Sequence, residues 1–311
     1  FAFAAALAVA TPVAAQDMDF TVSGADDALS TQLRQSSLTQ QALAKDAPTA
    51  QDIFAAARAD YARLTAELYG AGYYSGVISI RLNGREAGAY AALDMPEQIN
   101  SVTIEIDTGP RFRLGKAEIG PLAAETELPE GFATGRIARV GVIKDAAQES
   151  VSAWRQQAHA KATVADQAIT ANHKNQQLDV AIRLAPGPRL RFGTLSIAGY
   201  DRLTPQRLRK IAGFPEGEWF SPEALSQMRK RLRRTGIFSA VSIEESDTIS
   251  AGNTLDIALQ VTEAPLRRLG FGAELSSLDG LNLSGYWLHR NLLGGGERFR
   301  VDGEITGIGG S

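Results

Sequence analysis

The strongest constraint on the fold is a seven-residue motif that occurs twice. Residues 109–115 read Gly-Pro-Arg-Phe-Arg-Leu-Gly, and residues 187–193, which begin 78 positions later (187 − 109), read Gly-Pro-Arg-Leu-Arg-Phe-Gly. A degraded third copy starts with Ala264-Pro265, 77 positions after the second (264 − 187). Proline fixes φ and lacks a backbone N–H, so each copy is expected to end a strand and redirect the chain. Three copies at one period indicate a tandem array of small domains.

Length and composition narrow the function classes. A chain of 311 residues is long enough for two or three domains, and the repeat favours three domains followed by a C-terminal segment. The net charge of −3 gives the whole molecule no strong attraction to nucleic acid, which is not expected as a partner. The absence of cysteine excludes disulfides, thiolate metal sites and a cysteine nucleophile. No phosphate-binding loop, Gly-x-Ser-x-Gly elbow or dinucleotide fingerprint occurs, and the three histidines are expected on the surface or in turns. We therefore expect no catalytic residues, no metal and no cofactor.

The N-terminal residues 1–15 are predicted to be the remains of a secretory signal peptide. Residues 1–10 are apolar and small, Thr11-Pro12 interrupts them, and Val13-Ala14-Ala15 offers small residues where a signal peptidase cuts. An alanine-rich helix or a membrane anchor is the alternative. The run is shorter than the roughly 20 apolar residues that span a bilayer, and proline stops it, so export is favoured.

Hydrophobic periodicity predicts one element order, strand-helix-helix-strand-strand, in three successive units. The predicted units are residues 16–108, 109–186 and 187–265. The predicted helices are residues 25–43 and 52–70 in the first unit, 131–138 and 146–160 in the second, and 205–212 and 222–234 in the third. The predicted strands are 18–23, 77–82 and 102–106, then 112–119, 162–170 and 178–184, then 190–197, 237–243 and 254–261. The fold class is therefore α+β.

Matching segments in the first and third units carry a family resemblance. Residues 68–77 and 232–241 both place a helix end, a glycine, an aromatic residue and a strand in register. A unit of this order, whose second helix ends in Leu-x-x-x-Gly-aromatic, resembles the polypeptide-transport-associated (POTRA) domain. The resemblance covers about residues 16–265 and is most specific in the third unit.

The C-terminal segment, residues 266–311, has a different period. From Leu269 to Ser276 every odd position is apolar and every even position is small or polar, and two similar alternating runs follow. Such alternation is typical of transmembrane barrel strands, although a soluble β-meander gives the same pattern. Residues 287–297 resemble the connection between the second and third barrel strands of the BamA/TamA superfamily of outer-membrane assembly proteins. Three strands cannot close a barrel, so the sequence is expected to be the N-terminal part of a longer protein.

The resemblance implies a function. In this superfamily POTRA domains in the periplasm precede a sixteen-stranded barrel in the outer membrane. The implied partners are unfolded outer-membrane or autotransporter proteins and membrane lipid. Three units fit the TamA branch, which implies a TamB-like periplasmic partner, better than BamA, with five. A two-partner secretion transporter, with two units and a plug helix, and a soluble periplasmic adaptor without a barrel remain alternatives.

Four groups of candidate site residues follow. Free sheet edges recruit extended peptides by strand addition, and the resemblance assigns that edge to the second strand of the unit, unless a neighbour or loop shields it. The second candidate is the first barrel strand, and the third is the set of Gly-Pro joints. The fourth is a basic cluster, which either contacts anionic membrane or forms only a solvated face. The edge residues are Val77, Ile78, Ile80, Ile237, Phe238, Val241 and Ile243; the seam residues are Leu269, Gly270, Phe271, Gly272, Ala273 and Leu275; the joints are Gly109, Pro110, Gly187, Pro188 and Pro265; the basic residues are Arg229, Lys230, Arg231, Arg233 and Arg234.

Overall fold

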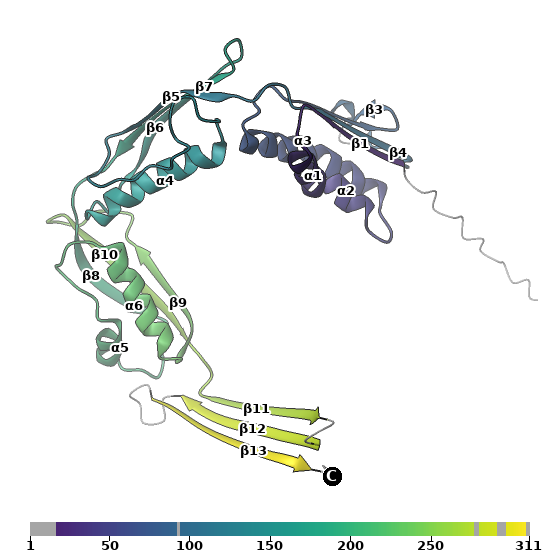
Figure 1. The fold of residues 1–311 in the computed structure, drawn as a ribbon. Helices are drawn as coiled ribbons and strands as arrows, with labels where there is room; N and C mark the ends of the chain where they lie inside the picture. The colour runs from purple at the N-terminus through teal and green to yellow at the C-terminus, as the bar shows by residue number, and fades with distance from the viewer. Residues whose placement is uncertain (1–16, 92–93, 277–279, 291–296, 309–311) are drawn as a thin grey trace, which may run out of the picture. The chain divides into compact units, whose positions relative to one another are not determined.

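The computed structural model describes residues 17–91, 94–276, 280–290 and 297–308 (Figure 1). The predicted signal segment, residues 277–279 and most of the predicted connection between barrel strands (residues 291–296) lie outside these residues. The chain divides into two compact units, one of residues up to 120 with 127–149 and 165–183, the other of residues 121–126, 150–164 and 184–311. The division passes through the second predicted domain. Among the described residues, no helix combines the length and the apolar character needed to cross a membrane.

The first sheet has the order β1-β4-β2-β3, with three helices on one face (Figure 1). β1 (Asp17–Ser23) runs parallel to β4 (Ser101–Asp107), and β2 (Val77–Leu82) runs antiparallel to it. β3 (Arg85–Glu86) pairs with the end of β2, and a 3-10 turn, η1 (Ala87–Ala89), follows. The helices are α1 (Asp27–Ser36), α2 (Leu38–Leu43) and α3 (Ala50–Ala71).

The region predicted at 25–43 as one helix or more consists of two helices. Ser37 ends α1 and caps α2, because its extended backbone leaves its side chain free to accept from the Gln40 N–H at 3.1 Å. The buried carboxylate of Asp60 on α3 reinforces the break. It accepts hydrogen bonds from the Ser37 hydroxyl at 2.7 Å and from the backbone N–H groups of Leu38 and Thr39 at 2.7 and 3.0 Å. A partner far along the chain therefore satisfies the start of α2.

The second sheet has the order β5-β7-β6. Its strands are β5 (Arg113–Gly120), β6 (Thr163–Asn172) and β7 (Gln177–Ala185), and its helix is α4 (Val140–Gln156). The predicted short helix at 131–138 is wrong. Gly135 has a φ of 81°, and its N–H donates to the Leu114 carbonyl at 2.7 Å, while the Ala138 N–H donates to the Phe112 carbonyl at 3.0 Å. This segment folds back along β5, so its backbone groups are satisfied without a helix.

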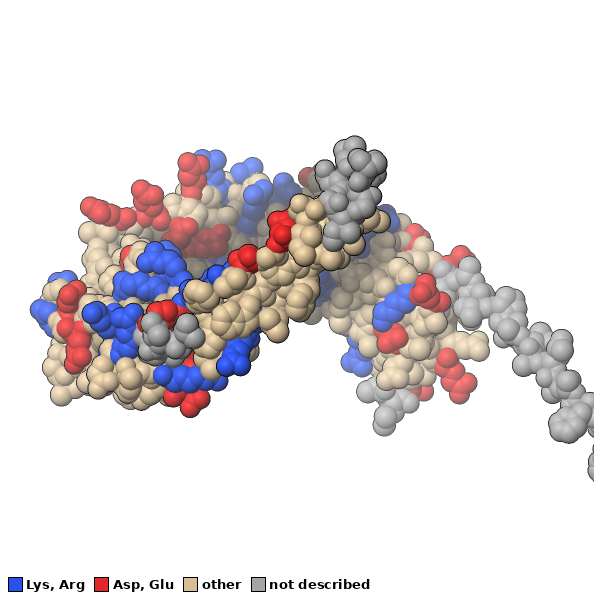
Figure 2. Space-filling view, turned by 90° about the horizontal axis from the view of Figure 1, so that it is seen from below, with Lys and Arg blue, Asp and Glu red and all other residues tan. Residues whose placement is uncertain are grey.

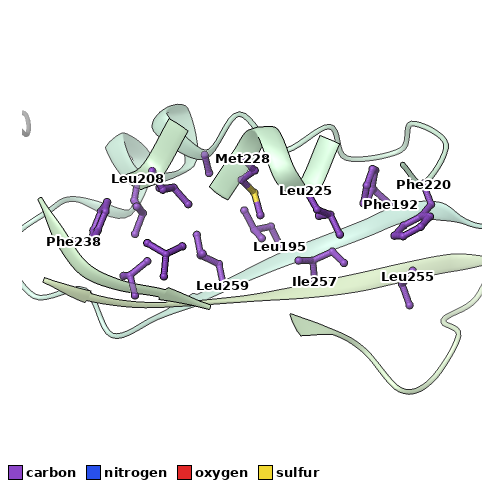
Figure 3. Packing of buried hydrophobic residues seen from close by; sticks show 14 of the residues in the cluster. Phe192, Leu195, Leu208, Phe220, Leu225, Met228, Phe238, Leu255, Ile257 and Leu259 are labelled. Atoms are coloured by element: carbon purple, nitrogen blue, oxygen red, sulfur yellow. The ribbon is translucent and has the colours of Figure 1, made fainter. Parts of the chain in front are cut away.

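The third sheet has the order β8-β10-β9, with β8 (Arg191–Ala198), β9 (Phe238–Glu245) and β10 (Thr254–Glu263). β9 begins one residue later than predicted. The helices α5 (Pro205–Ala212) and α6 (Pro222–Arg234) start with proline after Thr204 and Ser221, whose side chains cap them. Figure 3 shows Leu225 and Met228 of α6 pointing toward Leu195, Ile257 and Leu259 of the sheet, where the core of this domain lies.

The structure explains the last glycine of the repeated motif. A Cβ added to Gly115 would lie 2.3 Å from the Asp179 carboxylate, and one added to Gly193 would lie 2.2 Å from the Asp256 carboxylate. Each aspartate accepts the next N–H of the strand, from Lys116 at 2.8 Å and from Thr194 at 2.7 Å. Because both sheets contain the same device, the repeat in the sequence is a repeat in the structure.

The fourth sheet is antiparallel, in the order β11-β12-β13. Its strands are β11 (Arg267–Ser276), β12 (Gly280–Arg290) and β13 (Arg298–Ile308). They are longer than most strands of the other sheets (Figure 1). This open sheet contains the strands that the sequence predicted as the first strands of a β-barrel.

Candidate functional site

One edge of the third sheet is formed by β9, and the other by β8. Its register with β10 is regular from Ala240 to Glu245, and the pairing shifts between Thr262 and Glu263. Of the four edge residues predicted here, Ile237 precedes the strand and is buried, Phe238 and Val241 are buried within it, and Ile243 is half-buried. These side chains anchor β9 to the core, so what the edge offers to another chain is its backbone.

A single arginine fixes the end of this edge. Arg155, near the end of α4, lies in the same compact unit as the third sheet and places Nη2 2.5 Å from Oε1 of Glu245. Its guanidinium also lies 5.2 Å from the centre of the Phe220 ring. Both side chains are mostly buried, so this ion pair is less exposed to screening than a surface pair. No local pattern indicates this ion pair, because 90 residues separate the two groups.

The predicted edge residues of the first sheet are only partly at an edge. Val77 is 64 % exposed, Ile78 is half-buried and Ile80 is fully buried. Beyond β2 lies β3, which pairs with Arg81 and Leu82. The alternative that the sequence left open, shielding by a neighbour or loop, therefore holds for this end of β2.

A third edge, in the second sheet, was not predicted. β6 is the outer strand, and nearly all of its ten residues are exposed on both faces. Its exposed apolar side chains include Val164 and Ile169. The sequence signal was weak because small and polar residues interrupt the alternation.

The fourth sheet has one apolar and one polar face. Large apolar side chains of one face are exposed, with Phe271 86 % and Leu275 82 % accessible. Of the predicted seam residues, Leu269, Phe271 and Leu275 lie among them on β11, the outer strand of this sheet. Such exposed surface is typical of a sheet that faces lipid. The other members of the apolar set are Leu283, Phe299, Val301 and Ile305.

The polar face of this sheet explains one glycine of the seam. Gly270 pairs with Tyr286, which pairs with Asp302 on the far strand. A Cβ added to Gly270 would lie 2.2 Å from the Tyr286 ring, so this ring covers the glycine and requires it. The Arg300 guanidinium lies 4.2 Å from the centre of the same ring and binds Asp302. Polar groups of this kind suit a water-filled barrel interior.

The joints combine glycine conformation with contacts that the sequence did not reveal. Gly109 and Gly187 have φ values of 63° and 68°, which only glycine adopts without strain. At Pro265 the joint is held by Arg290 of β12, whose Nη1 donates to the Pro265 carbonyl at 2.9 Å and whose Nε donates to the Gly236 carbonyl at 2.8 Å. The neighbouring His289 is buried, which corrects the prediction that each histidine lies on the surface or in a turn.

Glu263 closes the third sheet immediately before this joint. Its carboxylate accepts the backbone N–H groups of Asp201, Arg202 and Leu203 at 3.0, 2.9 and 3.2 Å. Burial alone raises the pKa of Glu263, but these hydrogen bonds and the charge of Arg202 outweigh it and lower the pKa overall. The charged carboxylate thus fixes the loop that leads into α5.

The basic cluster on α6 divides into two groups. Arg231 points to the end of α5, where its Nη2 donates to the carbonyls of Ala212 and Gly213 at 2.7 and 3.0 Å. Lys230, Arg233 and Arg234 are exposed, and Arg229 is half-buried. Figure 2 shows Lys and Arg side chains gathered on part of one face, with acidic side chains among them. Of the five basic residues, Arg231 is therefore the one that connects α6 to the end of α5 through hydrogen bonds to backbone carbonyls.

No group of three or more His, Asp or Glu side chains within the described ranges is arranged to hold a metal ion. The groups described above offer hydrogen bonding by strand edges, apolar contact by the fourth sheet and charge on α6.

Comparison with known proteins begins with the third domain. Residues 190–264 match the POTRA family, described as "Surface antigen variable number repeat". A curated relative, the outer membrane protein assembly factor BamA of Neorickettsia risticii, is 20 % identical over 231 residues, which cover 71 % of this chain. The chain is therefore similar to outer-membrane assembly proteins of the BamA type, and its third domain matches the POTRA family. It spans 30 % of the length of that relative. The location predicted from the sequence, an outer-membrane protein with periplasmic POTRA domains, is that of the superfamily.

Solved structures show the same fold. The POTRA3–5 segment of BamA from Haemophilus influenzae aligns with a TM-score of 0.54 and 17 % identity, and covers 80 % of this chain and 96 % of that one. BamA from Haemophilus ducreyi lacking POTRA domains 1–3 aligns with a TM-score of 0.51 and 20 % identity, over 63 % of this chain and 37 % of that one. The chain thus shares with these structures a fold of α+β domains in tandem.

Proposed function

We propose that the full-length protein is an outer-membrane assembly factor, which captures unfolded β-barrel and autotransporter clients and helps to insert them into the outer membrane. The observation that carries this proposal is the combination of an open sheet edge at β9 with a sheet whose apolar face is exposed, in one chain of the superfamily. No covalent bond is made or broken, so neither an enzymatic step nor a cofactor is required.

Capture is proposed to occur by strand addition. A client segment that pairs with β9 gains main-chain hydrogen bonds, which depend little on its sequence. That property suits clients that are themselves unfolded β proteins with diverse side chains. The buried anchors Phe238 and Val241 hold the accepting strand in place, while Ser242 and Glu244 remain exposed beside the edge.

Insertion is proposed to use the first barrel strand. β11 is an outer strand of the fourth sheet, and two of its residues, Gly270 and Gly272, have no side chain that packs against a neighbouring strand. Glycine weakens a strand, which favours an edge that opens and admits a client strand. Lys230, Arg233 and Arg234 are proposed to contact anionic lipid headgroups beside the barrel.

The domain division and the branch belong to the same proposal. We infer three POTRA domains, at residues 16–108, 109–186 and 187–265, and barrel strands from 266 onward. Equivalent glycine-aspartate contacts in the second and third sheets support the last two of these domains. Three domains favour the TamA branch, with a TamB-like periplasmic partner. A two-partner secretion transporter is the second candidate, which a dedicated exported substrate would distinguish.

The experiment that tests assembly uses the full-length protein in liposomes. An unfolded outer-membrane barrel protein is added, and its folded fraction is followed by heat-modifiable migration on a gel. Assembly activity predicts a higher folded fraction than in empty liposomes for several unrelated clients. The proposal is contradicted if liposomes with the protein fold no client faster than empty ones, or if the protein is recovered in the soluble periplasmic fraction of cells. Faster folding of one exported substrate alone favours the secretion transporter.

A further inference from the structure

The outer side of β2 is already occupied by groups of the same domain. The N–H of Ile80 donates to Oε1 of Glu86 at 3.0 Å, and its carbonyl lies 3.2 Å from the hydroxyl of Tyr61. Two residues on, the carbonyl of Leu82 accepts a hydrogen bond from the hydroxyl of Tyr90 at 3.1 Å. Together with β3, these contacts use backbone groups that a free edge leaves available.

The two side chains at Ile80 are held by further contacts. The Tyr61 hydroxyl, which comes from α3, also hydrogen-bonds to Oε1 of Glu86. The hydroxyl of Ser79 donates to Oε2 of Glu86 at 2.9 Å, and the Arg81 guanidinium lies 4.0 Å from the same oxygen. Burial, followed by the bond to Glu86, raises the pKa of Tyr61 to about 12. Tyr61 therefore remains a protonated donor at physiological pH.

β9 differs from β2 in its surroundings. It pairs with β10 alone among the described strands, and its last residue, Glu245, is fixed by Arg155 at one end only. In β2, by contrast, a fully buried residue has both its N–H and its carbonyl engaged by side chains. A client strand can add to β2 at this position only by displacing both side chains.

We propose that Tyr61 and Glu86 form an edge plug that keeps the first sheet from accepting a client strand and so directs strand addition to β9. The plug itself follows from the contacts of the first domain, whereas its effect on clients rests on the proposed function. Glu86 and Tyr61 are thus specificity-determining residues that never touch the client at its docking edge.

Hydrogen exchange in the full-length protein tests the plug without any client. E86A removes the acceptor of the Ile80 N–H, and Y61F removes only the hydroxyl. Glu105 provides the matched control, because its carboxylate also pairs with Arg81, at 3.2 Å, whereas the Ile80 N–H donates to Glu86. Loss of a hydrogen bond to a charged group predicts exchange of the Ile80 amide about 10- to 100-fold faster in E86A and unchanged in E105A. The amide of Ile104, in the core strand β4, reports whether the domain stays folded in each variant. An Ile80 amide that exchanges equally fast in all variants with Ile104 still protected overturns the plug.

Disulfide capture tests the effect on clients. Residues 1–311 contain no cysteine, so V77C on β2 and S242C on β9 each introduce a single reporter into this part of the protein. The probe is a synthetic peptide of the last strand of an outer-membrane barrel protein, with one cysteine. We expect capture at S242C only in the parent protein, and at both positions when E86A and Y61F are added.

The outcomes separate the two proposals. Faster exchange at Ile80 without capture at either position retains the plug and contradicts the proposed strand addition. The plug as a specificity device is contradicted if V77C and S242C capture the peptide equally in the parent protein. It is also contradicted if S242C still captures the peptide but E86A and Y61F produce no gain at V77C.

Discussion

Replacing Glu263 tests whether the third domain and its joint to the barrel are fixed as described. In E263A the three backbone N–H groups of Asp201, Arg202 and Leu203 lose their shared acceptor. Asp201 and Arg202 are exposed, so water can replace the carboxylate there, whereas Leu203 is buried. In E263Q one carbonyl oxygen remains to accept these bonds, but the charge is lost.

The magnitude follows from the surroundings of each donor. An unsatisfied buried N–H costs about 1–3 kcal/mol, and each of the two hydrated donors adds about 0.5 kcal/mol, so E263A is expected to lose about 2–4 kcal/mol. E263Q is expected to lose about 1 kcal/mol, the difference between a charged and a neutral acceptor.

Hydrogen exchange of α5 in the full-length protein is the assay, because the loop held by Glu263 leads into this helix. A loss of about 2–4 kcal/mol corresponds to exchange roughly 30- to 1000-fold faster, at about 1.4 kcal/mol for each tenfold change. Glu216, an exposed residue of the same domain, gives the matched control E216A, which is expected to leave α5 unchanged. Equal exchange in E263A and E216A would refute the role assigned to Glu263.

Three further predictions concern the third domain and the repeat. The pKa of Glu263 is lower in the folded protein than its ordinary 4.5, so its carboxylate stabilises the fold above that value, and the difference in unfolding midpoint between the parent and E263Q should shrink as the pH falls below about 4.5. R231A should destabilise the third domain by about 1–2 kcal/mol in urea unfolding, because it removes the hydrogen bonds to Ala212 and Gly213. K230A should leave the stability unchanged and weaken binding to anionic vesicles. Equal stabilities of the two variants would contradict the division of the basic cluster. G193A should lower the free energy of unfolding, because its Cβ would meet the Asp256 carboxylate at 2.2 Å. G70A lies in a helix where nothing is within 4 Å of an added Cβ, so it should raise the free energy of unfolding by up to about 1 kcal/mol. A neutral G193A would contradict our explanation of the motif.

Local chemistry accounts for what the sequence could predict. Thr204-Pro205 and Ser221-Pro222 place two helix starts correctly, because a capping side chain and a proline at the first position act within one turn. The Gly-Pro joints and the alternating strands of the fourth sheet depend equally on neighbours in the sequence. The repeat itself identified the tandem organisation before any contact was known.

Long-range contacts account for what it could not. Residues 131–138 have turn-forming glycines but no helix, since their partners are backbone groups of β5 about 20 positions away. The same reasoning explains Arg231, which the sequence placed in a basic cluster and the structure places at the end of another helix. The closed edge of β2 requires Tyr61 and Glu86, 25 residues apart, to meet at Ile80. No pattern in the sequence reports such a meeting.

The central claim, capture of client strands at the β9 edge, is tested most directly by comparing two serine-to-cysteine variants of the full-length protein in the membrane. Ser242 lies on β9 and Ser196 on β8, the opposite outer strand of the same sheet, and both are exposed. During assembly of an outer-membrane client with single cysteines in its strands, strand addition at β9 predicts disulfide cross-links at S242C and few or none at S196C. Equal cross-linking at the two positions, or cross-linking at S196C alone, would contradict it.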